Sequence, residues 1–350
     1  MRYETRRADI ARCINSSVQQ IFPEGDIYFV TDDQWLGLAA TYYGLRAMAV
    51  EDIDTLPGAS SVVLFLRKRP VSADIWRTLR IRESRVLLIP ITAFDSSLVA
   101  ALYTQRLAMI TDYIGTRRLY RGLMKCVEKA AEPLTLDNDD DVAITVLDDL
   151  AAPAESRVAP IAAGQRIEIG SYCQVTLTPR AAGHAPAPCH IEGTALASAV
   201  LVSRDAEPGS EPASDLEVAH RLLATRCPIM LDIRDGVVAG LRAAGPRPAV
   251  GPRPAAGLAG EDLADIARAA IDPRGCAADL YVREISLGAN DAIRPHVNWN
   301  INSPLHAGAG TVRIAVGADG SNRQIDFIMA PAQKTRRARA VLGTLRTETA

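Results

Sequence analysis

The sequence predicts a small parallel α/β domain followed by a mainly β domain. Over the first 95 residues, apolar runs of strand length alternate with helix-like patterns, which is typical of a parallel sheet covered by helices. A long helical pattern comes next, and after Pro133 short strands and turns dominate. We therefore expect an α/β domain over 1–95, a helical connection over 96–132, a β-rich domain over 133–330 and a basic tail over 331–350.

Apolar spacing predicts the elements of the first part. The expected strands are 26–30, 61–66 and 85–90, and the expected helices are 34–48 and 71–82. No GxGxxG or GxxxxGK[ST] motif follows these strands, so no nucleotide cradle is expected. In the helical connection, Gly115 is the expected point of a bend or break.

The second part carries signals for strands and turns. The expected strands lie within 141–149, 165–179, 193–203 and 228–243. Asp235-Gly236 stands between alternating apolar residues and predicts a hairpin. Segments 204–215 and 244–257 are interpreted as exposed loops, with a proline-rich ligand for another domain as the alternative for the second. Residues 261–271 predict a short helix.

Composition excludes several classes of function. The chain has 350 residues and a net charge of −2, so binding to nucleic acid is not favoured. The basic stretch 334–346 is interpreted as a solvated helix or arm. The apolar runs are shorter than the roughly 20 residues that span a bilayer, and the first residues lack the apolar core of a signal peptide. Six cysteines without a CxxC pair fit a cytoplasmic protein with no membrane partner.

Two clusters resemble metal sites but lack essential ligands. Asp137 and Asp139–Asp141 have neither the glycine nor the distal glutamate of a calcium loop, so a solvated turn is preferred. His184, Cys189 and His190 have no second ligand pair, so a loop is preferred over zinc. We expect no metal and no cofactor.

Four stretches in order resemble the thermophilic metallo-aminopeptidase family of the aminopeptidase T and aminopeptidase S type. They are CQVTLTPRAAGHAPAPCHIEGTA (173–195), VREISLGAN (282–290), GTVRIAVG (310–317) and QIDFI (324–328). The resemblance covers about residues 110–330 and implies an aminopeptidase-like fold for the β-rich domain.

In that family two divalent ions are held by two glutamates, two histidines and an aspartate. Gln174 falls at the first glutamate and Glu284 at the second; Arg313 and Gln324 fall at the histidines and Asp326 at the aspartate. Three of the five ligands are thus replaced. The resemblance implies a degenerate site with no catalytic residues, and we favour a protein without enzymatic activity.

Charge explains why an arginine belongs in such a site. Without metal ions, crowded carboxylates repel one another. Arginine stays protonated and has no lone pair for a metal, but its planar fork can bind carboxylates. We therefore expect Arg313 to lie between Glu284 and Asp326 in place of a cation. A purely structural role for these residues remains open, since a buried ion pair adds little net stability.

The resemblance implies a cleft that still holds a peptide, because peptidase clefts bind extended backbone. The chain is similar to crocagin-type peptide-binding proteins from pathways that modify ribosomally made peptides. The implied partners are a precursor or leader peptide, a peptide-modifying enzyme, and a second copy or paralogue in a dimer. Asn298, Trp299 and Asn300 are candidate contacts, and a core tryptophan capped by turn amides is the alternative.

Three other functions stay open from the residues alone. One is an active hydrolase whose metal site is rebuilt from Glu284 and Asp326 with His296 or His306. Another is an enzyme of a different class that acts on a peptide through the α/β domain. The third is a scaffold that mainly forms dimers.

Overall fold

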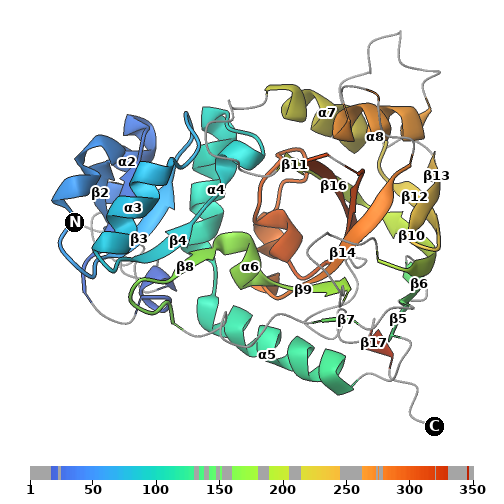
Figure 1. Ribbon diagram of the computed structural model, residues 1–350, viewed down its shortest axis with the longest axis horizontal. Coiled ribbons are helices and arrows are strands. Elements are labelled where there is room, and N and C mark those ends of the chain that lie inside the picture. Colours follow the sequence, from blue (N-terminus) through green and yellow to red (C-terminus); the bar gives the residue numbers. More distant parts are fainter. Residues whose placement is uncertain are drawn as a thin grey trace, which may run out of the picture.

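The computed structural model of the protein contains two sheets (Figure 1). The described residues are 17–22, 25–129, 134–137, 142–146, 150–151, 160–179, 189–204, 214–244, 262–272, 275, 279–319, 321–329 and 345–346. Within them, a five-stranded parallel sheet in the N-terminal half precedes a larger antiparallel sheet. The predicted fold class is confirmed: an α/β part with a small parallel sheet, then a mainly β part.

The parallel sheet has the strand order β2-β1-β3-β4-β8. Its strands are β1 (Ile27–Thr31), β2 (Arg46–Ala49), β3 (Ser61–Phe65), β4 (Arg85–Leu88) and β8 (Arg166–Glu168). Helix α3 (Ala73–Ile81) packs with Val62 and Leu64 on one face. Helix α2 (Gln34–Tyr42) packs with Val63 on the other. The strands are apolar on both sides because helices cover both faces.

The expected helix over 34–48 is wrong in its second half. Helix α2 ends at Tyr42, and Gly44 takes a φ of +79° that favours glycine. The Leu45 N–H then donates to the Ala40 carbonyl at 3.0 Å. Residues 46–49 form β2, which pairs with β1. Pairing with a neighbouring strand thus overrides the helical spacing of this segment.

The helical connection breaks earlier than expected. Its helices are α4 (Leu98–Ile110) and α5 (Tyr113–Lys129). Asp112 Oδ1 accepts the N–H of Gly115 at 3.0 Å, as a residue that caps a helix start does. Gly115 therefore lies in the first turn of α5, and the break precedes it.

The antiparallel sheet has the order β11-β16-β15-β14-β13-β12-β10-β6-β5-β17, and β9 pairs with β14 and β7 at its side. Its strands are β5 (Leu134–Asp137), β6 (Val142–Val146), β7 (Leu150–Ala151), β9 (Gln174–Pro179), β10 (Ile191–Ala197), β11 (Ala199–Arg204), β12 (Ile229–Arg234), β13 (Val237–Ala243), β14 (Tyr281–Gly288), β15 (Val312–Gly317), β16 (Arg323–Met329) and β17 (Leu345–Arg346). The predicted hairpin is β12–β13: Asp235 and Gly236 have φ angles of +49° and +76°, as a tight hairpin turn requires.

The segment 165–179 is not one strand. It forms β8, the short helix α6 (Ile169–Cys173) and β9. Because β8 pairs with β4, residues 166–168 complete the parallel sheet. The chain therefore returns to the first sheet after the helical connection.

One face of the antiparallel sheet packs against helices and forms the larger hydrophobic core with them. Helix α8 (Leu263–Ile271), which was predicted, and helix α7 (Ser214–Ala224), which was not, pack there together with α5. Figure 1 shows α7 and α8 side by side over the sheet. The opposite face contributes the small cluster of Leu201 and Ile328 with Trp299, and it also carries the polar residues of the candidate site.

Several expected features fall outside the described residues. They are Asn138–Asp141, His184, most of the two expected loops, and most of the basic tail. Of that tail, Leu345–Arg346 pairs with β5 as a strand rather than a helix. In the part of the chain that the structure describes, no helix has both the length and the apolar character needed to cross a membrane.

Candidate functional site

A polar row lies on one face of neighbouring strands β14, β15 and β16. Arg313 of β15 stands opposite Ser286 of β14, and Asp326 of β16 stands opposite Ala315. Side chains alternate between the two faces of a sheet. The register therefore brings Glu284, Ser286, Arg313 and Asp326 to the same side.

Arg313 joins the members of this row. Its Nη1 donates to Asp326 Oδ2 at 2.9 Å, and its Nη2 donates to Ser286 Oγ at 3.0 Å and forms an ion pair with Glu284 Oε1. Gln324 Nε2 donates to Asp326 Oδ1 at 3.2 Å. The prediction that one guanidinium meets both carboxylates is confirmed.

The charged groups of Arg313 and Asp326 in this cluster are buried, so each one requires a partner of opposite charge. Arg313 is 5% exposed and Asp326 is 0% exposed. Burial raises the pKa of the Asp326 carboxyl, and the charge and hydrogen bond of Arg313 offset part of that rise. Without the guanidinium, the enclosed Asp326 carboxylate would lose its counter-charge while Glu284 remains on the same face of the sheet. Arg313 therefore supplies the positive charge that the cluster requires.

Gln174 stands at the end of the row rather than inside it. On β9 it lies opposite Gly288, whereas Thr176 lies opposite Ser286. The Gln174 Oε1 atom is buried without a hydrogen-bond partner among the described residues. Ser286 Oγ instead donates to Thr176 Oγ1 at 3.1 Å. Sequence reasoning missed Ser286 and Thr176, although both lie two residues from a predicted site residue, which is the spacing that keeps a strand residue on the same face.

The rearranged metal site proposed as an alternative is not assembled. Among the described residues, no group of three or more His, Cys, Asp or Glu side chains is placed to hold a metal ion. His306 Nε2 lies 2.9 Å from Tyr103 Oη, and its ring packs edge-on against Trp299. His296 is exposed. Arginine, not histidine, adjoins Glu284 and Asp326.

The segment with Asn298, Trp299 and Asn300 forms a turn beside this histidine. Asn298 Oδ1 accepts the N–H of Asn300 at 3.2 Å, and the Asn298 N–H donates to Tyr103 Oη at 2.6 Å. Trp299 is half-buried and packs against two core clusters. The arrangement matches the alternative of a core tryptophan capped by turn amides, while both asparagines stay exposed.

One edge of the antiparallel sheet is closed by a side chain. Strand β11 is the last strand on that side. Asn302 Oδ1 accepts the Val202 N–H at 3.1 Å, and Asn302 Nδ2 donates to the Val202 carbonyl at 2.6 Å. The amide thus pairs with Val202 as a neighbouring strand would, and a peptide cannot add there without displacing it.

The parallel sheet carries two hydrogen-bonded aspartates where such sheets usually bind ligands. Strand order reverses between β1 and β3, and ligands of open α/β sheets occupy that crevice. Here the Asp32 carboxylate accepts backbone N–H groups of Arg67 and Lys68 at 2.8 Å and of Arg69 at 3.0 Å. Asp33 pairs with Arg67 at 2.6 Å. Asp32, Asp33 and Lys68 also line a pocket of about 570 Å³, so this crevice keeps a cavity beside these contacts.

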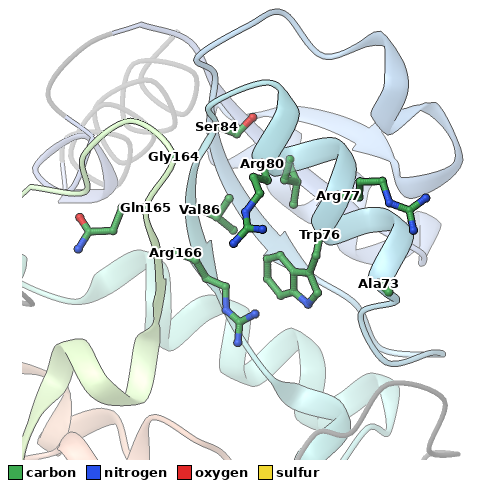
Figure 2. Close-up of a pocket in the computed structure, with 10 residues that line it drawn as sticks. Ala73, Trp76, Arg77, Arg80, Ser84, Val86, Gly164, Gln165 and Arg166 are labelled. Atoms are coloured by element: carbon green, nitrogen blue, oxygen red, sulfur yellow. The ribbon is translucent and has the colours of Figure 1, made fainter.

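Two pockets border the parallel sheet. One, of about 570 Å³, lies between α2 and the edge strand β2 and reaches the carboxyl end of β1. Its lining includes Gly37 and Leu38 on the helix, Ala47–Ala49 on the strand, and the charged residues Asp32, Asp33, Glu51 and Lys68. The other, of about 540 Å³, lies between α3 and strands β4 and β8 (Figure 2).

Comparisons with known proteins give one family. A family model described as "Crocagin biosynthetic protein CgnE/B" matches residues 24–337. No curated protein matches the chain. Among solved structures, the chain is similar to 2,5-dihydroxypyridine dioxygenase from Pseudomonas putida KT2440, with 12% identity, 92% of each chain covered and a TM-score of 0.48.

Proposed function

The chain belongs to the crocagin biosynthetic protein CgnE/B family, and we propose that it binds a precursor peptide of that ribosomal pathway without cleaving it. The observation that carries this proposal is Arg313 between Glu284 and Asp326. In the metallo-aminopeptidases that the sequence resembles, metal ions hold such carboxylates. A guanidinium has no lone pair to ligate a metal, so the cluster keeps its charge balance while losing the means of hydrolysis.

The buried cluster itself offers little surface to a peptide. Asp326 is fully enclosed, whereas the Glu284 side chain is 24% exposed and Gln324 is half-buried. With β11 closed by Asn302, the edge strand β2 is the better place for an extended segment, because no strand of the described chain pairs with its outer side. A peptide that adds to a sheet edge gains backbone hydrogen bonds.

An apolar stripe lies beside this edge. Trp35, Leu38 and Tyr42 of α2 are 54%, 60% and 52% exposed and follow one another at helical spacing. Contiguous exposed apolar side chains of this kind mark interaction surfaces. We assign the α2–β2 groove to an extended, partly apolar segment of the precursor peptide.

The test titrates the precursor peptide encoded beside the gene into metal-analysed protein by calorimetry. We expect binding without bound metal, and mass spectrometry should show an intact peptide. Leu38→Asp should weaken binding at least tenfold, whereas Val218→Asp, an equally polar change at the exposed surface of α7, should not. Stoichiometric metal with turnover would overturn the proposal in favour of an aminopeptidase.

Light scattering separates peptide binding from a scaffold role. If the wild-type protein binds no peptide and Leu38→Asp converts a dimer to monomers, the apolar stripe on α2 is a contact between two copies of the chain. The function would then be that of a dimerising scaffold for a peptide-modifying enzyme, and the proposed function would fail.

A further inference from the structure

The pocket between α3 and the β8 edge of the parallel sheet has a strongly positive lining. Its walls include Trp76, Arg77 and Arg80 from α3, Val86 from β4, and Gln165 and Arg166 at the start of β8. The volume of about 540 Å³ is within the range of small-ligand sites. No aspartate or glutamate lines it, although the whole chain carries a net charge of −2.

Two of the arginines are placed to meet a ligand. Figure 2 shows Arg80 and Arg166 pointing into the same space beside Trp76, while Arg77 points away. Arg77 pairs with Asp74 at 3.0 Å. Within the described chain Arg80 has no ion pair, and the carboxylate near Arg166 is Glu168 at 3.7 Å. Two like charges that share a pocket repel each other, so an anion between them is favoured.

The geometry of Arg166 points to a carboxylate. Its guanidinium carbon lies 4.1 Å from the centre of the Trp76 ring, a distance typical of a cation–π contact. This contact helps to hold the guanidinium in place, and a guanidinium can bind a planar carboxylate through two parallel hydrogen bonds.

The wall that carries Arg166 is held in place. The Gly164 N–H donates to the Glu83 carbonyl at 2.9 Å, and the Val86 N–H donates to the Gln165 carbonyl at 2.9 Å. Ala162 N–H also donates to Gln165 Oε1 at 3.0 Å. A site that is ordered before binding loses less entropy when the ligand enters.

We propose that this pocket binds a carboxylate of the precursor peptide, an inference that rests on the proposed function. The carboxylate is an Asp or Glu side chain or the peptide's C-terminus. Because strands lie about 4.8 Å apart, β8 is about 20 Å from β2, and at least about six extended residues must separate the two bound segments. Since α2 and α3 cover opposite faces of the sheet, the residues between the two bound segments would also pass around the end of the sheet.

The experiment is a double-mutant cycle between protein and peptide, measured by calorimetry. Arg80→Ser and Arg166→Ser should each lower the affinity for the precursor peptide about tenfold or more. Arg166→Lys keeps the charge but loses the planar guanidinium, and it should lower the affinity as well. The peptide is then tested with each Asp or Glu changed to its amide and with an amidated C-terminus. One of these peptide changes should lower the affinity for wild-type protein as much as Arg166→Ser does. The same peptide change should not lower the affinity of the Arg166→Ser variant any further. Arg118→Ser, an exposed arginine of α5 outside the pocket, is the matched control.

The outcomes separate the two proposals. If wild-type protein binds no precursor peptide, the proposed function fails and this inference fails with it. If folded Arg80→Ser and Arg166→Ser bind the peptide as wild type does, only the role of the pocket is overturned. Inorganic phosphate is titrated into the same proteins. If Arg80→Ser and Arg166→Ser lose phosphate binding but keep the wild-type affinity for the peptide, the pocket is a phosphate site and its role in peptide binding is overturned.

Discussion

Arg313 Nη1 lies 2.9 Å from Asp326 Oδ2 on the neighbouring strand, and both side chains are almost completely enclosed. Such a pair contributes little net stability compared with well-packed apolar residues, but removal of one partner leaves an uncompensated charge. The cluster should therefore tolerate joint replacement better than loss of the arginine alone.

Arg313→Ala should lower the free energy of unfolding by about 3 kcal/mol or more, because Asp326 and Glu284 lose their counter-charge. Urea denaturation followed by circular dichroism measures the change, with Arg118→Ala as the matched surface control. Adding Asp326→Asn to Arg313→Ala should recover part of the loss. Equal stability of Arg313→Ala and the control would show that the buried contact is not formed.

Returning histidines to the row should restore metal binding. In the double variant Arg313→His and Gln324→His, two imidazoles would adjoin Glu284 and Asp326, since Arg313 and Gln324 both contact Asp326 now. Imidazole and carboxylate are the ligands of catalytic zinc sites. We expect calorimetry to show zinc binding at least a hundredfold tighter than to wild-type protein, and the added Asp326→Asn change should weaken it. If wild-type protein binds zinc as tightly as the double variant does, the guanidinium of Arg313 does not take the place of a metal ion.

Local signals predicted much of the fold. The strands β1, β3 and β4 are near-continuous apolar runs, and Asp235-Gly236 specifies the β12–β13 turn. Segments whose structure depends on distant partners were predicted less well. Residues 46–48 were assigned to a helix, yet pairing with β1 makes them part of strand β2. Residues 166–168 were assigned to the second domain, yet they pair with β4.

The same contrast applies to the sites. The resemblance to the metallo-aminopeptidases placed Glu284, Arg313 and Asp326 in one site, and charge balance then predicted that the arginine meets both acids. The pocket of Arg80, Arg166 and Trp76 could not be predicted. Its two arginines are brought together only by the β4–β8 pairing, and no local pattern in the sequence signals that contact.

Acid should destabilise the protein through two buried imidazoles. Burial lowers the pKa of His306 to about 3 and that of His220 to about 4, from an ordinary value of 6.5. Below pH 6.5 the unfolded chain takes up protons that the folded protein does not. Stability is therefore complete above that pH and falls by about 1.4 kcal/mol per pH unit for each imidazole. The raised pKa of Asp326 acts in the opposite direction, because the folded state keeps that proton longer as pH rises.

Urea denaturation at pH 7.5, 6.0 and 5.0 measures this slope. His306→Gln and His220→Gln should each make it shallower, whereas His296→Gln, at an exposed position, should leave it unchanged. A wild-type slope that equals the slope of both buried-histidine variants would show that the imidazoles titrate alike in the folded and unfolded states.

Loss of the side chain that closes β11 should open that edge of the sheet. Asn302 is fully buried, and its amide satisfies both the N–H and the carbonyl of Val202. Asn302→Ala leaves two backbone groups without partners, at a cost of about 1–3 kcal/mol each. We expect a loss of about 2–4 kcal/mol in the free energy of unfolding and faster hydrogen exchange at the Val202 amide. Asn300→Ala, at an exposed position of the same segment, should stay within about 0.5 kcal/mol of wild type. If Asn302→Ala retains the slow exchange of Val202, another group must cover the edge, and β11 would no longer be excluded as a peptide site by Asn302.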